Sequence, residues 1–405
     1  MQRTILHCDL NNFFATVEVL RNPTLRGKPV AVCGDPEKRG GIVLAKSEEA
    51  KKHGIKTGDV IWEAKQKCPD LVIVSNHGDY SQYARKVRDI YYRYTDKVES
   101  FGSDECWLDI TGSLKLLGKN GKQIADELRE AIKSELDLTI SVGVSFTKTF
   151  AKLGSDYKKP DATTEITPEN FRELVWNMPV GSLLNVGRKS RALFEKLNIK
   201  TIGDLARFDV DILHAYIGNV NAECLVKAAR GEETDEVGTY GDKRVVKSVG
   251  NGTTVPRDLV TFTEARQVMY LLCEEVAYRM RKKGFKGFTV SLTIRDADLH
   301  WVSAQESIKE PTNSVKTLLA AAESIFYKLW DKKPIRALRV CASNLTTDKR
   351  VQLSLFHEGA TEDKNDKLSE VFDNVRRKHG TGIINYGTLL GSDFDLHFDV
   401  ADESF

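Results

Sequence analysis

Three acidic residues, Asp9, Asp104 and Glu105, have the side-chain type and the placement that a site for divalent cations requires. Asp9 ends a short β-prone run, and the other two stand side by side between two further β-prone runs. Carboxylates grouped on a sheet bind hard cations such as Mg²⁺. A pair of such ions can activate an attacking hydroxyl group and neutralise charge on a leaving pyrophosphate. The three residues therefore indicate metal-assisted phosphoryl transfer.

The elements around these carboxylates decide whether they can meet. Residues 4–10 form a predicted strand in which His7 and Asp9 share one face, because strand side chains alternate. Consecutive residues such as Asp104 and Glu105 would point to opposite faces of a regular strand. We therefore expect a turn or bulge at this point, and the Gly-Ser pair directly before Asp104 favours one.

The predicted elements through residue 146 follow the order strand, helix, strand, strand, helix, strand, with an interruption of about 65 residues after the first helix. This order is typical of a split βαββαβ domain. From residue 168 to 231 the chain becomes helical, with short loops. Beyond it, we predict strands at 245–249, 288–295 and 336–343, helices at 263–282 and 312–330, and a tail helix near 367–378.

Composition sets the broad class of the protein. The chain has 405 residues, of which 41% are hydrophobic and 29% are charged, values typical of a soluble globular protein of two or three domains. No apolar run approaches the ~18 residues that a membrane helix needs, and Asp9 lies where a signal peptide would be apolar. The seven cysteines form no Cys-x-x-Cys pair, so we expect reduced thiols, most of them buried. We expect a cytoplasmic protein with no membrane association.

Charge is unevenly distributed along the chain although the net charge is only +2. Residues 243–350 hold 20 Lys and Arg against 11 Asp and Glu, which gives +9. Residues 357–405 hold 5 against 11, which gives −6. A basic segment followed by an acidic tail is consistent with a polyanion-binding domain and a separate appendage, although solvated faces of no particular function would also explain it.

Several stretches resemble, in order, the motifs of the Y-family DNA polymerases, the lesion-bypass group that includes the bacterial DNA polymerase IV and UmuC types. The resemblance runs from residue 1 to about residue 356. It implies an α+β right-hand fold with a split βαββαβ palm, small fingers, a helix–hairpin–helix thumb and an α/β little finger. The matching stretches are residues 9–18, 27–32, 49–58, 103–110, 141–145 and 150–153, and the pair Lys159-Pro160.

This resemblance also implies domain boundaries. A palm would span residues 1–165, with fingers inserted at about 20–75. A thumb at 166–232, a charged linker at 233–242 and a little finger at 243–350 would follow. Residues 351–405 would hold a clamp-binding motif and the acidic tail, for which the sequence indicates no function.

By the same resemblance, Asp9, Asp104 and Glu105 are the catalytic, metal-binding carboxylates, and the Leu10 carbonyl is a further ligand. Two Mg²⁺ ions are implied, with Mn²⁺ as an alternative. The predicted nucleotide-binding residues form a separate set, in which Phe14 is also the steric gate that excludes a 2′-OH. This set is Asn12, Phe13, Phe14, Lys51 and Lys159.

The chain departs from the family pattern on the fingers helix. The family usually has Tyr and Arg there, and this chain has Glu48 and Lys51. A lysine holds phosphate as a point charge without the two-pronged geometry of arginine. A glutamate beside a triphosphate would repel it unless its side chain turned away or paired with a cation such as Lys46. The departure therefore affects nucleotide affinity more than chemistry.

The predicted DNA contacts lie in two places. Lys247, Arg257, Arg336 and Arg339 are candidates for phosphate contacts from the little finger. Gly187 and Gly218 each stand in a turn before a helix of the thumb, where backbone N–H groups can hold phosphate.

A short peptide after the little finger resembles the pentapeptide with which bacterial polymerases bind the sliding clamp. It consists of Gln352, Leu353, Ser354, Leu355 and Phe356. Docked apolar side chains would raise the local concentration of the protein on DNA. About fifty residues follow the peptide, as in the UmuC type.

The sequence thus predicts a monomeric DNA polymerase that uses primer–template DNA, deoxynucleoside triphosphates and a sliding clamp. Two alternatives remain. A catalytically silent clamp-associated repair scaffold is disfavoured because all three carboxylates are present. A nucleotidyl cyclase, which shares a palm-like fold, is disfavoured by the thumb turns and the clamp-like peptide.

Overall fold

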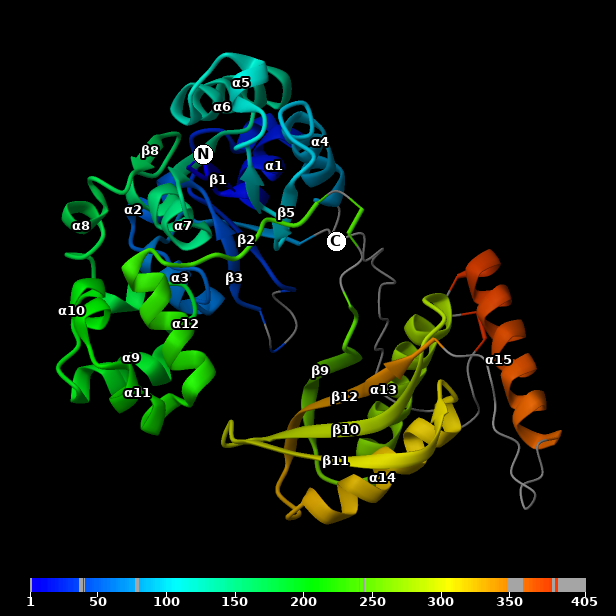
Figure 1. The fold of residues 1–405 in the computed structure, drawn as a ribbon. Helices are drawn as coiled ribbons and strands as arrows, with labels where there is room; N and C mark the ends of the chain where they lie inside the picture. Colours follow the sequence, from blue (N-terminus) through cyan, green and yellow to red (C-terminus); the bar gives the residue numbers. More distant parts are fainter. Residues whose placement is uncertain are drawn as a thin grey trace. The chain divides into compact units, whose positions relative to one another are not determined.

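The computed structural model describes residues 2–35, 39, 41–76, 80–239, 241–242, 245–347, 360–380 and 383–384. The chain divides into two compact units, one made mainly of residues 1–242 and the other mainly of residues 243–401. Figure 1 colours the first unit from blue to green and the second from green to red.

The central element of the first unit is a five-stranded sheet with the order β5-β6-β1-β7-β8. Strand β1 pairs antiparallel with both β6 and β7, and β8 pairs parallel with β7. The first four strands and their helices form the split βαββαβ domain that the sequence predicts. The strands are β1 (Ile5–Leu10), β5 (Val98–Phe101), β6 (Glu105–Asp109), β7 (Ile140–Ser145) and β8 (Thr163–Ile166).

Helices cover both faces of this sheet (Figure 1). On one face, Leu6 and Cys8 of β1 join Ile124 and Leu128 of α6 in an apolar core. The opposite face packs against α7. Since alternate residues of β1 face the two sides, the same strand serves both. The palm helices are α1 (Phe13–Arg21), α4 (Ser81–Tyr91), α5 (Leu114–Leu117), α6 (Gly121–Leu136) and α7 (Lys148–Tyr157).

The long interruption after α1 forms the fingers, a small sheet of order β3-β2-β4 with its own core. Ser47 begins α2, and its hydroxyl accepts a hydrogen bond from the backbone N–H of Ala50. The elements are η1 (Pro23–Leu25), β2 (Val30–Cys33), β3 (Val43–Lys46), α2 (Glu48–Lys52), α3 (Ile61–Lys67) and β4 (Val72–Ser75).

The thumb is helical, as the sequence predicts, and its helices bury Phe194, Ile202 and Leu213 in a third core. Gly187 and Gly218 directly precede α9 and α12. The elements are α8 (Phe171–Leu174), η2 (Val180–Ser182), α9 (Arg188–Lys196), α10 (Ile202–Arg207), α11 (Val210–Ile217) and α12 (Asn219–Arg230).

The second unit is a four-stranded antiparallel sheet of order β11-β10-β12-β9, with α13 and α14 packed on one face. The predicted strands and helices of this region are present, and β11 is an additional strand that the sequence interpretation missed. The elements are β9 (Ser248–Leu259), α13 (Phe262–Lys282), β10 (Lys286–Asp296), β11 (Trp301–Thr312), α14 (Val315–Leu329) and β12 (Ile335–Thr346).

A tail helix, α15 (Ala360–His379), belongs to the second unit and is longer than the predicted 367–378. Arg281 of α13 donates from Nε and Nη2 to Asp373 at 2.7 and 2.9 Å. Arg376 pairs with Glu274 of α13 at 2.6 Å. Ion pairs that are largely buried therefore hold the end of the tail helix on α13.

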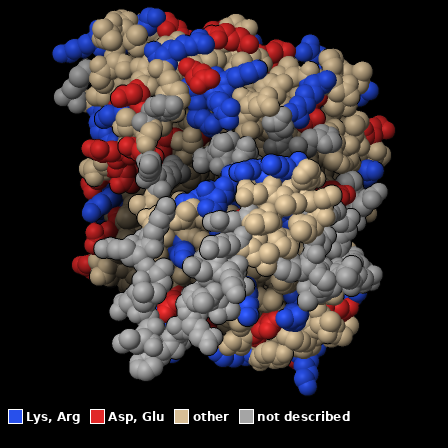
Figure 2. Space-filling model, turned by 90° about the vertical axis from the view of Figure 1, so that its right-hand side faces the viewer, with Lys and Arg blue, Asp and Glu red and all other residues tan. Residues whose placement is uncertain are grey.

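The described surface carries charges of both signs. On the face drawn in Figure 2, blue Lys and Arg side chains lie among red Asp and Glu side chains. None of the helices in the described part of the chain is both long and apolar enough to span a bilayer. All seven cysteines are free thiols and five are buried, as expected.

Candidate active site

The register of β1 and β6 brings two of the three predicted carboxylates together. Asp9 on β1 lies directly opposite Glu105 on β6. Asp104 belongs to the turn before β6, and its carbonyl accepts a hydrogen bond from the Leu10 N–H at 3.0 Å. Gly102 makes this turn possible, since its φ of 77° is one that other residues rarely adopt. The turn that the sequence argument required is therefore present.

Helix α7 covers the face on which Asp9 and Glu105 lie. It approaches β7 so closely that a Cβ atom on Gly143 would lie 1.8 Å from the Ala151 carbonyl oxygen. Only glycine permits this approach. His7, two residues before Asp9 on β1, contacts the same helix, and its Nδ1 lies 2.7 Å from the Ser155 hydroxyl.

Two lysines supply positive charge to the carboxylates. Lys159 Nζ donates to Asp9 Oδ2 and contacts Asp156 Oδ1, each at 2.7 Å. Lys152 of α7 pairs with Glu105. The same Glu105 Oε2 lies 3.1 Å from His7 Nε2. Asp9 and Glu105 are thus each held by an ammonium group.

Burial and mutual repulsion raise the pKa values of these carboxylates, and neighbouring cationic or hydrogen-bonding groups lower them, so the three shift in different directions. Burial raises the pKa of Asp9 to about 6 despite the nearby Lys159 ammonium. Burial, followed by repulsion from Glu105, also raises the pKa of Asp104. Although burial alone would raise it, contacts with His7 and Lys152 hold the pKa of Glu105 at about 2. Burial lowers the pKa of His7, so its ring is neutral at pH 7.

These residues fit a divalent cation by their chemistry. All three offer hard oxygen ligands, and the raised pKa values of Asp9 and Asp104 show that the local positive charge does not fully compensate their buried negative charge. Their oxygens are not gathered into one tight cluster, however. Among the described residues, three ligand atoms that all lie within 4.8 Å of one another occur elsewhere.

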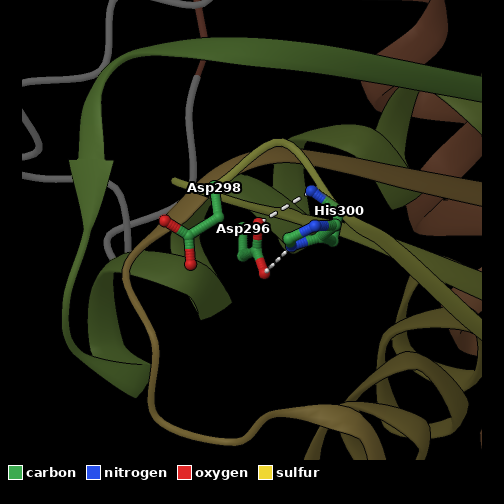
Figure 3. Close-up of side chains that lie close together, drawn as sticks. All are labelled: Asp296, Asp298 and His300. Carbon is green, nitrogen blue, oxygen red and sulfur yellow. Dashed lines mark hydrogen bonds and ion pairs between the residues drawn. The ribbon is translucent and has the colours of Figure 1, made fainter.

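That tighter cluster consists of Asp296, Asp298 and His300 in the second unit. In Figure 3, Asp296 Oδ1 accepts a hydrogen bond from the backbone N–H of His300, and its Oδ2 lies 3.5 Å from Nδ1 of the same residue. Lys333 Nζ lies 3.7 Å from a carboxylate oxygen of each aspartate. Because a lysine already neutralises this exposed turn, we assign it no metal.

The predicted steric gate rests on an aromatic stack. Phe14 is half-buried, and its ring lies parallel to that of Tyr80, with centroids 4.1 Å apart and planes 13° apart. Phe13 is different, because it is only 3% exposed and belongs to the palm core. Only the backbone of Phe13 is therefore available to a ligand.

The other predicted nucleotide-binding residues lie in two groups. Asn12, at the start of α1, donates from Nδ2 to Glu48 Oε1 at 2.9 Å, and Lys51 Nζ lies 3.4 Å from the same oxygen. Glu48 therefore pairs with Asn12 and Lys51, whereas the sequence argument suggested Lys46. Lys159 lies apart from this group, on Asp9.

The predicted DNA-binding residues are all described. Lys247 and Arg339 are exposed, and Arg336 is partly exposed on β12. Arg257 is engaged by Glu264 within the second unit. Gly187 and Gly218 have open space where a Cβ atom would lie. The predicted clamp-binding peptide at 352–356 lies outside the described residues.

Sequence reasoning gave no role to several residues of the site. Lys152 and Asp156 come from α7 and contact Glu105 and Lys159, respectively. Tyr80 supports Phe14 from α4's N-terminal end. The only available signal was indirect: His7 shares a strand face with Asp9, and Lys152 lies in a recognised motif.

Comparisons with known proteins agree with this arrangement. Residues 8–156 match the model of the impB/mucB/samB family, and residues 246–355 match that family's C-terminal domain. A DNA polymerase IV of Acetivibrio thermocellus is 45% identical over 393 residues, which cover 96% of this chain and 98% of that protein. A DNA polymerase IV 2 of Bacillus subtilis is 36% identical and covers 96% of each chain.

The fold also resembles a solved structure. A Y-family DNA polymerase chimera superposes with a TM-score of 0.74 at 23% sequence identity, covering 85% of this chain and 100% of that one. This likeness confirms the predicted fold class of palm, fingers, thumb and little finger.

Proposed function

The chain belongs to the impB/mucB/samB family and is a DNA-directed DNA polymerase of the lesion-bypass type, and we propose that it extends a primer 3′-OH by two-metal phosphoryl transfer. The observation that carries this proposal is the pairing of Asp9 with Glu105 across β1 and β6, with Asp104 in the adjoining turn. No ordinary packing role requires three acidic groups at the edge of a buried sheet.

Asp9, Asp104, Glu105 and the Leu10 carbonyl would hold two Mg²⁺ ions, or Mn²⁺ in their place. Bound there, the ions would promote deprotonation of the primer 3′-OH and neutralise charge on the departing pyrophosphate. The protein itself must keep the carboxylates ionised and must place positively charged side chains near them. In the absence of metal, Lys152 and Lys159 perform the first task through their ion pairs.

The incoming deoxynucleoside triphosphate would lie along the start of α1. The first N–H groups of a helix have no partner within the helix and favour an anion. Asn12, Phe13 and Phe14 would offer backbone N–H groups, and Lys51 and Lys159 would offer charge. The Phe14 ring would lie against the sugar and leave no room for a 2′-OH.

The outer face of the second unit's sheet is suited to the DNA backbone. On this face, side chains that alternate with core residues lie opposite one another on neighbouring strands, and these paired positions include no Asp or Glu. A hollow of about 310 Å³ lies there, between Gly252, Trp301 and Arg339. The outward residues are Ser248, Gly250, Gly252, Thr254, Thr289, Ser291, Thr293, Arg295, Ser303, Gln305, Ser307, Ala337, Arg339, Cys341 and Ser343.

Small neutral side chains allow a polyanion to approach closely, and Arg339 and Arg295 add charge without reading sequence. In the thumb, the turns at Gly187 and Gly218 would hold DNA phosphates through backbone N–H groups. Lys247 and Arg336 would add contacts, and Arg257 would first have to leave Glu264.

Three further parts of the proposal concern the partner protein, the oligomeric state and the location, and they are based on the sequence. Residues 352–356 would bind the sliding clamp, whose ring would raise the local concentration of the enzyme on DNA. We propose that the chain acts as a monomer. Because its similar proteins come from bacteria and its substrate is DNA, we propose that it acts in the cytoplasm.

Primer extension with Mg²⁺ tests the catalytic assignment. The Asp104→Ala variant should lose at least about a hundredfold in kcat, because charge stabilisation by a bound metal is worth several kcal/mol. The matched control is Asp89→Ala, which removes an exposed carboxylate from α4 and should retain wild-type extension.

The outcomes separate the alternatives. Extension that persists in Asp104→Ala would reject this site. A wild-type protein that binds DNA and clamp but never extends a primer would be the silent scaffold. Release of pyrophosphate from a nucleotide without any primer would instead indicate a cyclase.

A further inference from the structure

The carboxylate of Glu48 occupies the place where the proposed nucleotide site has its phosphate-binding side chains. Its Oε1 accepts a hydrogen bond from Asn12 Nδ2 at 2.9 Å and lies 3.4 Å from Lys51 Nζ. A single oxygen therefore engages two of the residues that would otherwise face a triphosphate. Glu48 belongs to α2 of the fingers, and Asn12 belongs to the palm.

Asn12 has an unusual conformation that directs its side chain to Glu48. It is the N-cap residue of α1, yet its φ of 51° is left-handed and its side chain makes no capping hydrogen bond. An asparagine at this position ordinarily uses its side-chain oxygen to accept a bond from the helix's first N–H groups. Here the side-chain amide instead donates to Glu48, so these N–H groups have no side-chain cap from Asn12.

The surroundings of Glu48 are positively charged. Burial lowers the pKa of Lys46, and repulsion from the nearby Lys51 lowers it further. Two lysines close enough to repel each other form a site that favours an anion. Glu48 is the anion that the free protein itself supplies.

We propose that Glu48 is an internal competitor of the incoming triphosphate. It holds Asn12 and Lys51 in the nucleotide-free enzyme, and its side chain must turn away before phosphate oxygens take its place. This inference rests on the proposed function, since it assumes that the triphosphate binds at the start of α1. Because Glu48 acts on the phosphate side, it raises KM for all four deoxynucleotides by a similar factor.

The test is steady-state primer extension by Glu48→Gln, together with titration of a non-hydrolysable deoxynucleotide into the enzyme–DNA complex. Glutamine keeps an oxygen for Asn12 but removes the charge that holds Lys51 and repels phosphate. KM and the dissociation constant should both fall about fivefold for every deoxynucleotide, as expected for a partly exposed ion pair, and kcat should change by less than about twofold. High salt should shrink the difference.

Glu49→Gln is the matched control. It removes the same charge from the next residue of α2, which points about 100° away around the helix, so KM should stay at the wild-type value. Glu48→Ala is a second variant, which loses the bond to Asn12 as well and should also bind nucleotide more tightly than the wild type.

An unchanged or raised KM in Glu48→Gln and Glu48→Ala, in proteins that melt at the wild-type temperature, would overturn the inference. An equal fall of KM in Glu49→Gln would overturn it too, because the effect would then be general electrostatics. Failure of the proposed function looks different: Asp104→Ala would extend primers as well as the wild type, whatever the nucleotide KM.

Discussion

Phe14 is held in place by a chain of contacts that runs back into α1. Its ring stacks on Tyr80, whose hydroxyl donates to Glu18 Oε1 at 2.9 Å. Arg21 pairs with the same Glu18 oxygen at 3.0 Å and lies 5.5 Å from the centroid of the Tyr80 ring. These contacts support the Phe14 ring from behind, as a steric gate against a larger sugar requires.

Phe14→Ala should therefore admit ribonucleotides. We expect the ratio of kcat/KM for a ribonucleotide to that for its deoxynucleotide to rise by about tenfold or more, because a steric block is removed while the phosphate contacts remain. Single-nucleotide incorporation with matched pairs of substrates measures this ratio.

Phe13→Leu serves as the control, since Phe13 belongs to the core and its replacement by a smaller apolar residue affects packing there rather than the sugar. Sugar discrimination should not change in that variant. If Phe14→Ala keeps the wild-type preference for deoxynucleotides, the role of Phe14 is packing alone.

At the scale of single elements, the start of α13 shows how a few residues fix a helix end. Thr261 and Glu264 form a capping box, in which each side chain accepts a hydrogen bond from the backbone N–H of the other. Glu264 Oε2 also accepts from the Val260 N–H at 2.9 Å. These bonds, together with the Arg257 ion pair, lower the pKa of Glu264 to about 2.

This lowered pKa predicts a dependence of stability on pH. Because the folded value of about 2 lies below the ordinary value of 4.5, the contribution of Glu264 is complete above about pH 5 and is lost as pH falls toward 2. Glu264→Gln should therefore melt below the wild type at pH 7, and the difference in melting temperature should be clearly smaller at pH 3. A melting difference of the same size at both pH values would contradict this account.

The palm could be predicted from the sequence because its signals are local. Leu6 and Cys8 alternate with His7 and Asp9 on β1, so strand periodicity alone assigns the two faces. The turn at Gly102 follows from residue type. That Asp9 lies opposite Glu105 follows from no local pattern, and it was expected only from the family resemblance.

Other features depend on contacts that no local pattern reveals. Strand β11 was missed because it is an edge strand whose outward residues are polar and exposed, so its apolar alternation is weak. The pairing of Lys152 with Glu105 depends on how α7 lies over β1, which is a tertiary property. Lys46 was wrongly suggested as the partner of Glu48. The observed partner Asn12 lies 36 residues earlier in the chain, and no local pattern points to it.

At the scale of the whole molecule, the segment between the thumb and the second unit is not free along its length. Val237 is 3% exposed and packs with Ile5, Trp107 and Ala151 of the palm. The Gly238 N–H donates to Glu99 Oε2 at 3.0 Å. Part of the predicted linker at 233–242 therefore packs on the palm.

The division into two units also separates the candidate active site from the segment with the large net positive charge, since the +9 segment lies wholly in the second unit. If the outer face of that unit's sheet holds the DNA backbone, each phosphate contact adds a salt-dependent contribution to affinity. Arg339 is the test residue, because it is exposed on the outer face between Gly252 of β9 and Thr293 of β10.

Arg339→Gln should weaken binding to primer–template DNA and reduce the slope of log affinity against log salt by about 1, equally for unrelated sequences. Fluorescence anisotropy across a range of salt concentrations measures both quantities. Lys316→Gln removes one positive charge from α14, on the helical side of the same sheet, and should leave the slope unchanged. Each variant loses one positive charge, so a change in net charge alone would affect both slopes equally, whereas a direct phosphate contact at Arg339 would change only the slope of Arg339→Gln. Equal slopes in both variants and the wild type would therefore mean that the DNA lies elsewhere.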